Sequence, residues 1–317
     1  MLDILAVTFP FFALVLCGYV ATRWAFLPQV AIPGLNTFVL YFALPCMLYR
    51  FGATTPVLRL LSVGVVGVYV VCALAMVLIT FFVTRSHRVD ANDAAFGALV
   101  AAFPNTGYMG VPLLVALLGD AAAGPAIVTI LVDILFTSSL CIALSRLALA
   151  GTHGAAAAVR NALLGVVTNP MPWAIVLGVA SFAAGFVLPK PVMQTVALLG
   201  DAASPVALFT IGAVLARSQM VTSDRTPLVD YVPVALKKLV LHPLLVLGVG
   251  HAALALGAPI DRFALTVMVL VAALPSASNV AMLAERYEAD AGRIARIILV
   301  STALAFLTFS GAVALMR

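Results

Sequence analysis

The sequence is poor in charge: only 9% of its 317 residues are Asp, Glu, Lys or Arg, whereas 64% are hydrophobic. Soluble globular domains carry about 25% charged residues because they need a solvated surface, so this composition excludes that class. Lysine and arginine exceed acidic residues by 17 to 12, but they are scattered singly along the chain. A nucleic-acid partner would need a basic stripe or patch, so we expect none. The composition predicts an all-α, polytopic membrane protein.

The sequence also lacks the patterns of common catalytic and metal sites. It contains no His-Glu-x-x-His zinc motif, no Gly-x-Ser-x-Gly elbow and no phosphate-binding glycine signature. The four cysteines fall in apolar runs without ligand-like spacing, and we interpret them as small core residues. We therefore expect no enzyme, no cofactor and no metal.

The chain does contain apolar runs of the length that a membrane-spanning helix requires, about 20 residues. They cover residues 4–22, 31–50, 57–84, 92–118, 123–149, 167–188, 191–216, 232–256, 262–285 and 294–316. The first run follows no basic signal region, so we interpret it as a retained helix. About ten transmembrane helices follow, with both termini on one side. Basic residues are more frequent in the loops that lie on the same side of the membrane as Arg23. The positive-inside rule assigns that side to the cytoplasm, so both termini are expected outside.

Two parts of the chain are similar to each other. Residues 43–53 and 203–213 share Ala, Pro, Leu, Gly and Ala in register at a separation of 160, which also relates Gly18 to Gly178. With an odd number of spans in each half, the second copy enters the membrane from the opposite face. We expect a 5+5 inverted repeat, with its first half in residues 1–155 and its second in 160–317.

Two expected spans are interrupted near their middles, at residues 101–107 (Ala-Ala-Phe-Pro-Asn-Thr-Gly) and 272–279 (Ala-Ala-Leu-Pro-Ser-Ala-Ser-Asn). Proline breaks helical hydrogen bonding, and the freed groups are tolerated at membrane depth only around a cavity. Interrupted helices at corresponding places in two halves indicate a transporter's binding site. We predict that the substrate-binding residues are Pro104, Asn105, Thr106, Tyr108, Pro275, Ser276, Ser278 and Asn279. Alternatively, their polar groups only satisfy the freed backbone.

Acidic residues inside spans are candidates for function because burying a charge in a membrane is costly. Asp133 lies near the middle of the fifth span, and Asp201 lies one helical turn before Pro205 in the seventh. We expect both to be buried and to be candidates for proton coupling, with a structural hydrogen bond as the alternative. Asp93 at the start of the fourth span can complement the helix N-terminus.

Three basic residues have two interpretations. Lys237 and Lys238 in the eighth span, and Arg50 near the end of the second, either anchor the helices at the interface or attract an anion. His242 precedes a proline in the same span as the lysines, and we interpret it as a packed, hydrogen-bonded histidine.

Three stretches, residues 35–45, 104–113 and 274–287, resemble the auxin efflux carrier family, which includes plant PIN-type auxin exporters and bacterial carriers related to malonate transporters. The resemblance spans the chain. It implies the fold of bile-acid and sodium/proton carriers, in which helices 1, 2, 6 and 7 form a scaffold and helices 3–5 and 8–10 a transport domain. Broken helices four and nine then cross at the substrate site. The short connection at residues 150–160 favours a bacterial form in the inner membrane.

These observations together predict a secondary active transporter of a small organic anion, a malonate-like dicarboxylate or a monocarboxylate, that works by elevator-type alternating access. Its expected partners are the anion, the lipid bilayer, a coupling proton or sodium ion, and a second copy in a homodimer. One alternative is a sodium-coupled symporter of the bile-acid type. The other is an anion channel. A channel would need a continuous polar path, whereas this sequence predicts a single polar crossing.

Overall fold

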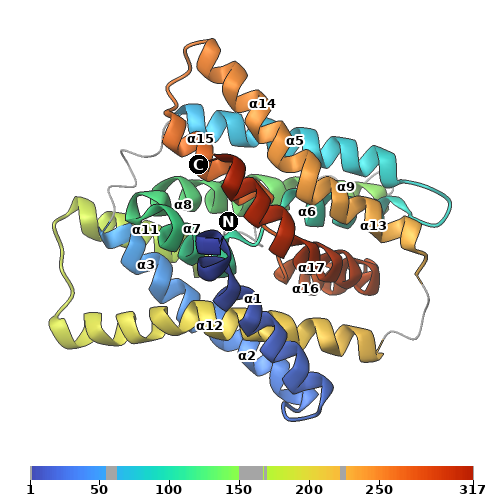
Figure 1. Ribbon diagram of the computed structural model, residues 1–317, viewed down its shortest axis with the longest axis horizontal. Coiled ribbons are helices and arrows are strands. Elements are labelled where there is room, and N and C mark those ends of the chain that lie inside the picture. The colour runs from blue at the N-terminus through green and yellow to red at the C-terminus, as the bar shows by residue number, and fades with distance from the viewer. Residues whose placement is uncertain (1, 55–62, 150–166, 168–169, 222–225, 317) are drawn as a thin grey trace.

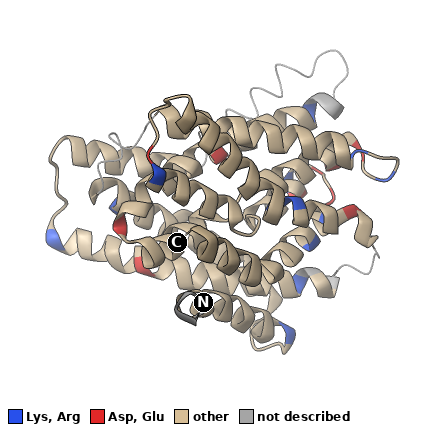
Figure 2. Cartoon of the chain, turned by 45° about the horizontal axis from the view of Figure 1, so that its top comes forward, with Lys and Arg blue, Asp and Glu red and all other residues tan. Residues whose placement is uncertain are grey.

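The computed structural model describes residues 2–54, 63–149, 167, 170–221 and 226–316. Over these residues the chain is built from helices, and the only β-type pairing is one bridge between Pro104 and Ser276. In the part of the chain that the structure describes, seven helical segments are long and apolar enough to cross a membrane, and three further apolar helices are shorter. Figure 2 shows long stretches of helix without a charged residue. The prediction of an all-α membrane protein is confirmed.

The helices follow the expected apolar runs. The first half contains α1 (Leu2–Arg23), η1 (Gln29–Ala31), α2 (Ile32–Phe38), η2 (Val39–Ala43), α3 (Leu44–Thr54), α5 (Val63–Thr84), α6 (Ala91–Ala102), η3 (Thr106–Gly110), α7 (Val111–Leu118), η4 (Asp120–Ala122), α8 (Ala123–Val132), η5 (Asp133–Thr137) and α9 (Ser138–Leu149). The second half contains α11 (Pro170–Ala183), α12 (Lys190–Val221), α13 (Leu228–Leu236), η6 (Lys237–Leu241), α14 (His242–Ala255), α15 (Arg262–Ala273), α16 (Asn279–Arg286) and α17 (Ala291–Met316). The expected boundary at residues 155–160 lies outside the described residues. That ten helices cross the bilayer stays a prediction.

The helices form two groups with a central layer between them. Figure 1 shows α1, α2, α3 and α12 on one side of the molecule and α5 and α14 on the other, with α6, α7 and α8 between. Glycines allow the closest approach within the first group. A Cβ at Gly18 of α1 would overlap the backbone of Phe209 in α12, and a Cβ at Gly212 would overlap the backbone of Val15. The pairing of α1 with α12 therefore depends on glycine on both helices.

A second glycine contact joins α3 to α11. A Cβ at Gly52 would lie 3.2 Å from the Cα of Gly178, and a Cβ at Gly178 would meet the backbone of Tyr49 and Ala53. The helices of both pairs are thus held at backbone distance, as small residues permit in membrane proteins.

Prolines account for three of the four π-helical segments in the described part of the chain. The segments η2, η3 and η6 each end two residues before a proline, namely Pro45, Pro112 and Pro243. Proline lacks an N–H donor and its ring clashes with the carbonyl four residues earlier, so the preceding turn widens. The fourth segment, η5, begins at Asp133 and has no proline after it.

A polar cluster joins the starts of α6 and α17. Asp90 caps α6 by accepting from the Asp93 N–H at 2.8 Å, and the Asp93 carboxylate accepts from the Asp290 N–H at 2.7 Å. The buried Arg293 donates to the carbonyl oxygens of Asp93 and Asp230 at 3.0 and 2.8 Å. Asp93 thus has structural partners at this helix start.

Candidate functional site

Two interrupted helices meet in the interior of the molecule. The first helix stops at Ala102 and resumes at Thr106, and the second stops at Ala273 and resumes at Asn279. The interruptions expected from Pro104 and Pro275 are therefore present. The two extended segments bond to each other: the Asn105 N–H donates to the Pro275 carbonyl at 2.9 Å, and the Ala277 N–H donates to the Phe103 carbonyl at 3.0 Å.

The resumed helices begin with unpaired backbone donors. In the first break, the N–H groups of Gly107 and Tyr108 have no acceptor among the described residues. In the second, the same is true of the N–H groups of Ser278 and Asn279, whereas the Ser276 N–H donates to Ser301 Oγ at 3.2 Å. Two helix N-termini, each with free N–H groups, therefore start at the same place.

Side-chain polar atoms at the breaks are also unpaired. Nine buried side-chain nitrogen and oxygen atoms lack a hydrogen-bond partner in the described part of the chain. Four of them belong to the two breaks: Thr106 Oγ1, Tyr108 OH, Ser276 Oγ and Asn279 Oδ1. Buried polar atoms in native proteins nearly always have partners, so this concentration indicates a place that binds a polar ligand.

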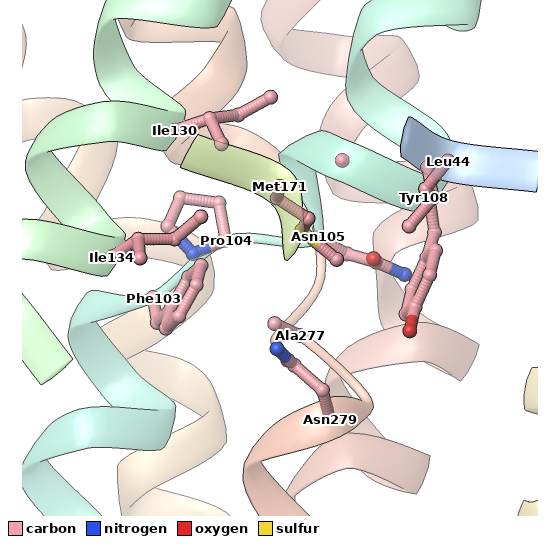
Figure 3. Close-up of a pocket in the computed structure, with 11 residues that line it drawn as sticks. Leu44, Phe103, Pro104, Asn105, Tyr108, Ile130, Ile134, Met171, Ala277 and Asn279 are labelled. Carbon is pink, nitrogen blue, oxygen red and sulfur yellow. The ribbon is translucent and has the colours of Figure 1, made fainter. Parts of the chain in front are cut away.

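A pocket opens beside the breaks. The space that no atom fills is about 310 Å³, its open mouth included. Figure 3 shows the Asn105 amide directed toward the Tyr108 ring, with the Asn279 amide entering from the other break. The lining residues are Leu44, Phe103, Pro104, Asn105, Gly107, Tyr108, Ile130, Ile134, Met171, Ala277 and Asn279.

The pocket chemistry suits an anion. Its lining contains no acidic and no basic side chain. The positive end of a helix dipole and its free N–H groups attract negative charge, and two such ends converge here. Asn105 and Asn279 add amide donors. A small carboxylate can therefore be bound without an arginine or lysine.

Of the predicted substrate-binding residues, Pro104, Asn105, Tyr108 and Asn279 line the pocket. The others, Thr106, Pro275, Ser276 and Ser278, belong to the same two breaks and are buried. Sequence reasoning missed the apolar lining, namely Leu44, Met171, Ile130 and Ile134. The only signal for Leu44 was its place beside Pro45 in the repeated segment, and nothing in the sequence singled out Met171.

Asp133 lies directly behind the pocket wall. It is fully buried at the start of η5, on the helical segment that carries the lining residues Ile130 and Ile134. Its carboxylate accepts hydrogen bonds from Tyr69 OH and Thr137 Oγ1, both at 3.1 Å. Nothing in the sequence indicates the Tyr69 contact, which joins residues 64 positions apart.

Asp201 is not buried, contrary to expectation. Its side chain is 64% exposed on the surface of the chain, and it forms an ion pair of 2.7 Å with Arg50. The two residues belong to neighbouring helices, α12 and α3, so each neutralises the other. This ion pair also explains Arg50, which the sequence left as either an anchor or an attractor of anions.

The adjacent lysines have different environments. Lys237 is partly exposed, whereas Lys238 is fully buried, so an interfacial anchor is the wrong interpretation for Lys238. The Lys238 ammonium donates to the Ala272 carbonyl at 2.6 Å and contacts His242 Nδ1 at 3.2 Å. His242 is therefore a packed, hydrogen-bonded histidine, as expected.

Comparisons with known proteins agree with this geometry. A family model described as "Membrane transport protein" matches residues 4–151 and 155–313. A protein of Rhizobium meliloti (strain 1021) named "Putative malonate transporter" is 32% identical over 100% of this chain and 97% of its own length. The "Uncharacterized transporter YfdV" of Escherichia coli (strain K12) is 28% identical over 88% of this chain and 86% of its own length, and the protein of that name in Shigella flexneri matches equally. The long apolar helices, the two bonded breaks and a family match over nearly the whole chain lead to one conclusion: the chain belongs to the membrane transport protein family, the auxin efflux carrier family.

Proposed function

We propose that this membrane transporter carries a small organic anion, a malonate-like dicarboxylate or a monocarboxylate, by secondary active transport. The observation that carries the proposal is the convergence of two helix N-termini with unpaired N–H groups on one pocket without charged side chains. The name of the relative from Rhizobium meliloti supports a malonate-like substrate.

We further propose that the anion binds between Asn105 and Asn279. Both amides face the pocket from opposite breaks (Figure 3). The free N–H groups of Tyr108 and Ser278 would donate to the carboxylate oxygens, and Thr106 and Ser276 would supply hydroxyl donors. A carboxylate bound there would accept from buried hydroxyl groups, such as that of Tyr108, which otherwise have no partner.

The chain is proposed to be a 5+5 inverted repeat, with halves at residues 1–155 and 160–317. The glycine contacts support this arrangement. Gly18 and Gly178 are 160 positions apart, and so are Gly52 and Gly212. Gly18 therefore corresponds to Gly178 in the second half, and Gly212 corresponds to Gly52 in the first. The contact of Gly18 with the helix of Gly212 has its counterpart in the contact of Gly178 with the helix of Gly52. A duplicated half explains why the same close approach occurs twice.

Elevator-type alternating access is the proposed mechanism. The scaffold would consist of α1, α2, α3, α11 and α12, held together by the glycine contacts, and the remaining helices would form the transport domain. The pocket lies between the two groups, because Leu44 and Met171 come from α3 and α11 whereas the other lining residues come from the breaks and from α8 and η5. A site at such a boundary can open to either side when one group moves past the other.

Asp133 is the proposed residue for proton coupling. It is buried and lies on the helical segment between the lining residues Ile130 and Ile134. A carboxylate inside the membrane is a functional candidate because burying its charge is costly. Asp201 is not retained, because it is exposed and paired with Arg50. The proposed location is the bacterial inner membrane, with both termini outside and a homodimer formed through the scaffold.

A thermal-shift screen of the purified protein against organic acids tests the substrate class. A ligand that binds only the folded state stabilises it by about 2.7 kcal/mol at 100 times its dissociation constant. Malonate or a related acid should raise Tm in a saturable way, whereas amines and neutral sugars of similar size should not. If no organic acid stabilises the protein under any condition, the proposed substrate class is wrong.

Counterflow in proteoliposomes separates a carrier from a channel. A carrier preloaded with unlabelled substrate accelerates the uptake of labelled substrate, and the rate saturates. A channel shows neither property. Replacing sodium with a large organic cation in the same assay distinguishes a sodium-coupled symporter, whose transport would stop.

A further inference from the structure

The fully buried Lys238 lies at the end of the helix that precedes the second break. Helix α15 stops at Ala273, inside the protein, where its terminal carbonyls cannot reach water. A continuous helix would satisfy the Ala272 carbonyl with the Ser276 N–H, but that N–H donates to Ser301. The Lys238 ammonium takes its place at 2.6 Å. A positive charge thus lies at the negative end of a half-helix.

The surroundings of Lys238 balance its charge. Lys238, His242, Asp133 and Tyr69 are all fully buried. Asp133 is near enough to attract Lys238 electrostatically without a direct ion pair, and Tyr69 and Thr137 hold its carboxylate in place. A buried ammonium is tolerated only with such partners.

The contact with His242 fixes the state of the imidazole. An ammonium has only donors, so His242 Nδ1 must accept, and the imidazole is then neutral with its proton on Nε2. That Nε2 atom has no partner in the described part of the chain. The ring lies 6.2 Å from the Tyr69 ring. Lys238 is therefore the cation of the cluster, and Asp133 is the carboxylate that faces it.

The cluster reaches the substrate site through two elements. Ala272 lies three residues before Pro275, whose carbonyl bonds to Asn105. Asp133 begins η5, the π-helical segment that no following proline explains, and π-bulges occur frequently at functional sites. A change in the charge of Lys238 would therefore alter the position of the second break and of the pocket wall.

We propose that Lys238 is a built-in cation that replaces a sodium ion at the end of α15 and makes substrate binding depend on its protonation. In many transporters, half-helix C-termini and freed carbonyls coordinate a sodium ion or a proton. Here the Ala272 carbonyl supplies such an oxygen, and the Lys238 ammonium donates to it at 2.6 Å, while the Asp133 carboxylate attracts the ammonium electrostatically. Lysine changes its protonation state readily when buried, so the site responds to pH and needs no sodium.

Other ionisable groups surround this site. Tyr69 and Cys72 are on α5, Asp133 is on η5, and His242 is on α14. The elements α6, α13, α15 and α17 also pack against η6, and Asp93, Asp230 and Arg293 belong to the polar cluster described above. The groups that face η6 or lie on elements packed against it are Tyr69, Cys72, Asp93, Asp133, Asp230, Tyr231, Lys237, His242, His251, Arg262, Arg293 and Arg296.

A first experiment needs no substrate. Tm of the purified full-length protein is measured in sodium chloride and in choline chloride. The wild-type protein and Lys237→Ala, the neighbouring lysine as matched control, should give equal values in both salts. Lys238→Ala leaves the oxygens without their cation, so sodium should raise its Tm by about 2 °C or more. Sodium-specific stabilisation of the wild-type protein, or none in a folded Lys238→Ala variant, would overturn the proposal.

A second experiment rests on the proposed function and uses malonate as the probe. Wild-type affinity should be the same with and without sodium and should fall as pH rises and Lys238 loses its proton, after correction for the titration of malonate. Lys237→Met should keep this profile. Lys238→Met should bind about tenfold more weakly or worse at low pH, with a flat profile. An unchanged pH profile of binding in Lys238→Met contradicts the proposal. A sodium requirement for binding to the wild-type protein also contradicts it, and this second measurement decides the question if the variant does not fold. Failure of malonate to bind at all would instead count against the proposed function.

Discussion

Replacing Asn105 by alanine tests whether the breaks bind substrate or only satisfy their own backbone. The main chain of Asn105 is already paired: its N–H donates to Pro275 at 2.9 Å, and its carbonyl accepts from Met109 at 3.1 Å and Gly110 at 3.0 Å. Alanine keeps all three bonds. The side chain is 3% exposed, makes no hydrogen bond in the described part of the chain and faces the pocket (Figure 3). The substitution should therefore leave the fold intact and remove only donors to the ligand.

The expected loss follows from leaving a buried carboxylate oxygen without its donor, which costs about 1–3 kcal/mol. That corresponds to a dissociation constant raised by about 5- to 150-fold. The assay is a calorimetric titration of the purified variant with the organic acid that stabilises the wild-type protein. Thr22→Val is a suitable control, because it removes a buried polar group that has no hydrogen-bond partner and lies outside the pocket. An unchanged affinity in a folded Asn105→Ala variant would refute the binding role and leave the alternative that Asn105 only supports the break.

Three further substitutions test the coupling residue, the support of the second break and the helix pairs. Asp133→Asn should flatten the pH dependence of uptake in proteoliposomes while substrate counterflow continues, because exchange does not require the empty carrier to release a proton. Asp201→Asn is the control: Asp201 is exposed and paired with Arg50, so this variant should keep the wild-type pH profile. A wild-type pH profile in both variants would contradict the coupling role of Asp133. Ser301→Ala removes the acceptor of the Ser276 N–H and should weaken ligand binding by about 1–3 kcal/mol in a titration; equal affinity would show that this bond does not position the break. Gly18→Ala would push a methyl group into the backbone of α12 and should lower stability by about 1–3 kcal/mol, whereas Gly67→Ala, with open space around it, should be neutral or slightly stabilising in the same thermal unfolding assay.

The sequence predicted the features that arise locally. Pro104 and Pro275 break their helices because a proline lacks an N–H wherever it lies, so the two interruptions could be placed before any tertiary contact was known. The apolar runs predicted the helices for a similar reason, since a span must satisfy its backbone within itself. Asn105 and Asn279 were found because they follow those prolines directly.

The residues behind and around the pocket could not be found in this way. Inside a membrane protein, lipid and protein interior are both apolar, so the pattern of hydrophobic residues does not show which face of a helix is buried. For this reason Asp201 was expected in the interior, although it lies on the surface beside Arg50. For the same reason Lys238 was left as either an interfacial anchor or an attractor of anions, although it is fully buried. The sequence by itself determined the class of protein and the position of the breaks. Only the tertiary structure decided that the two breaks bond to each other and that Lys238 meets Ala272 across 34 residues, because such contacts depend on how separate helices pack and not on the order of residues within any one of them.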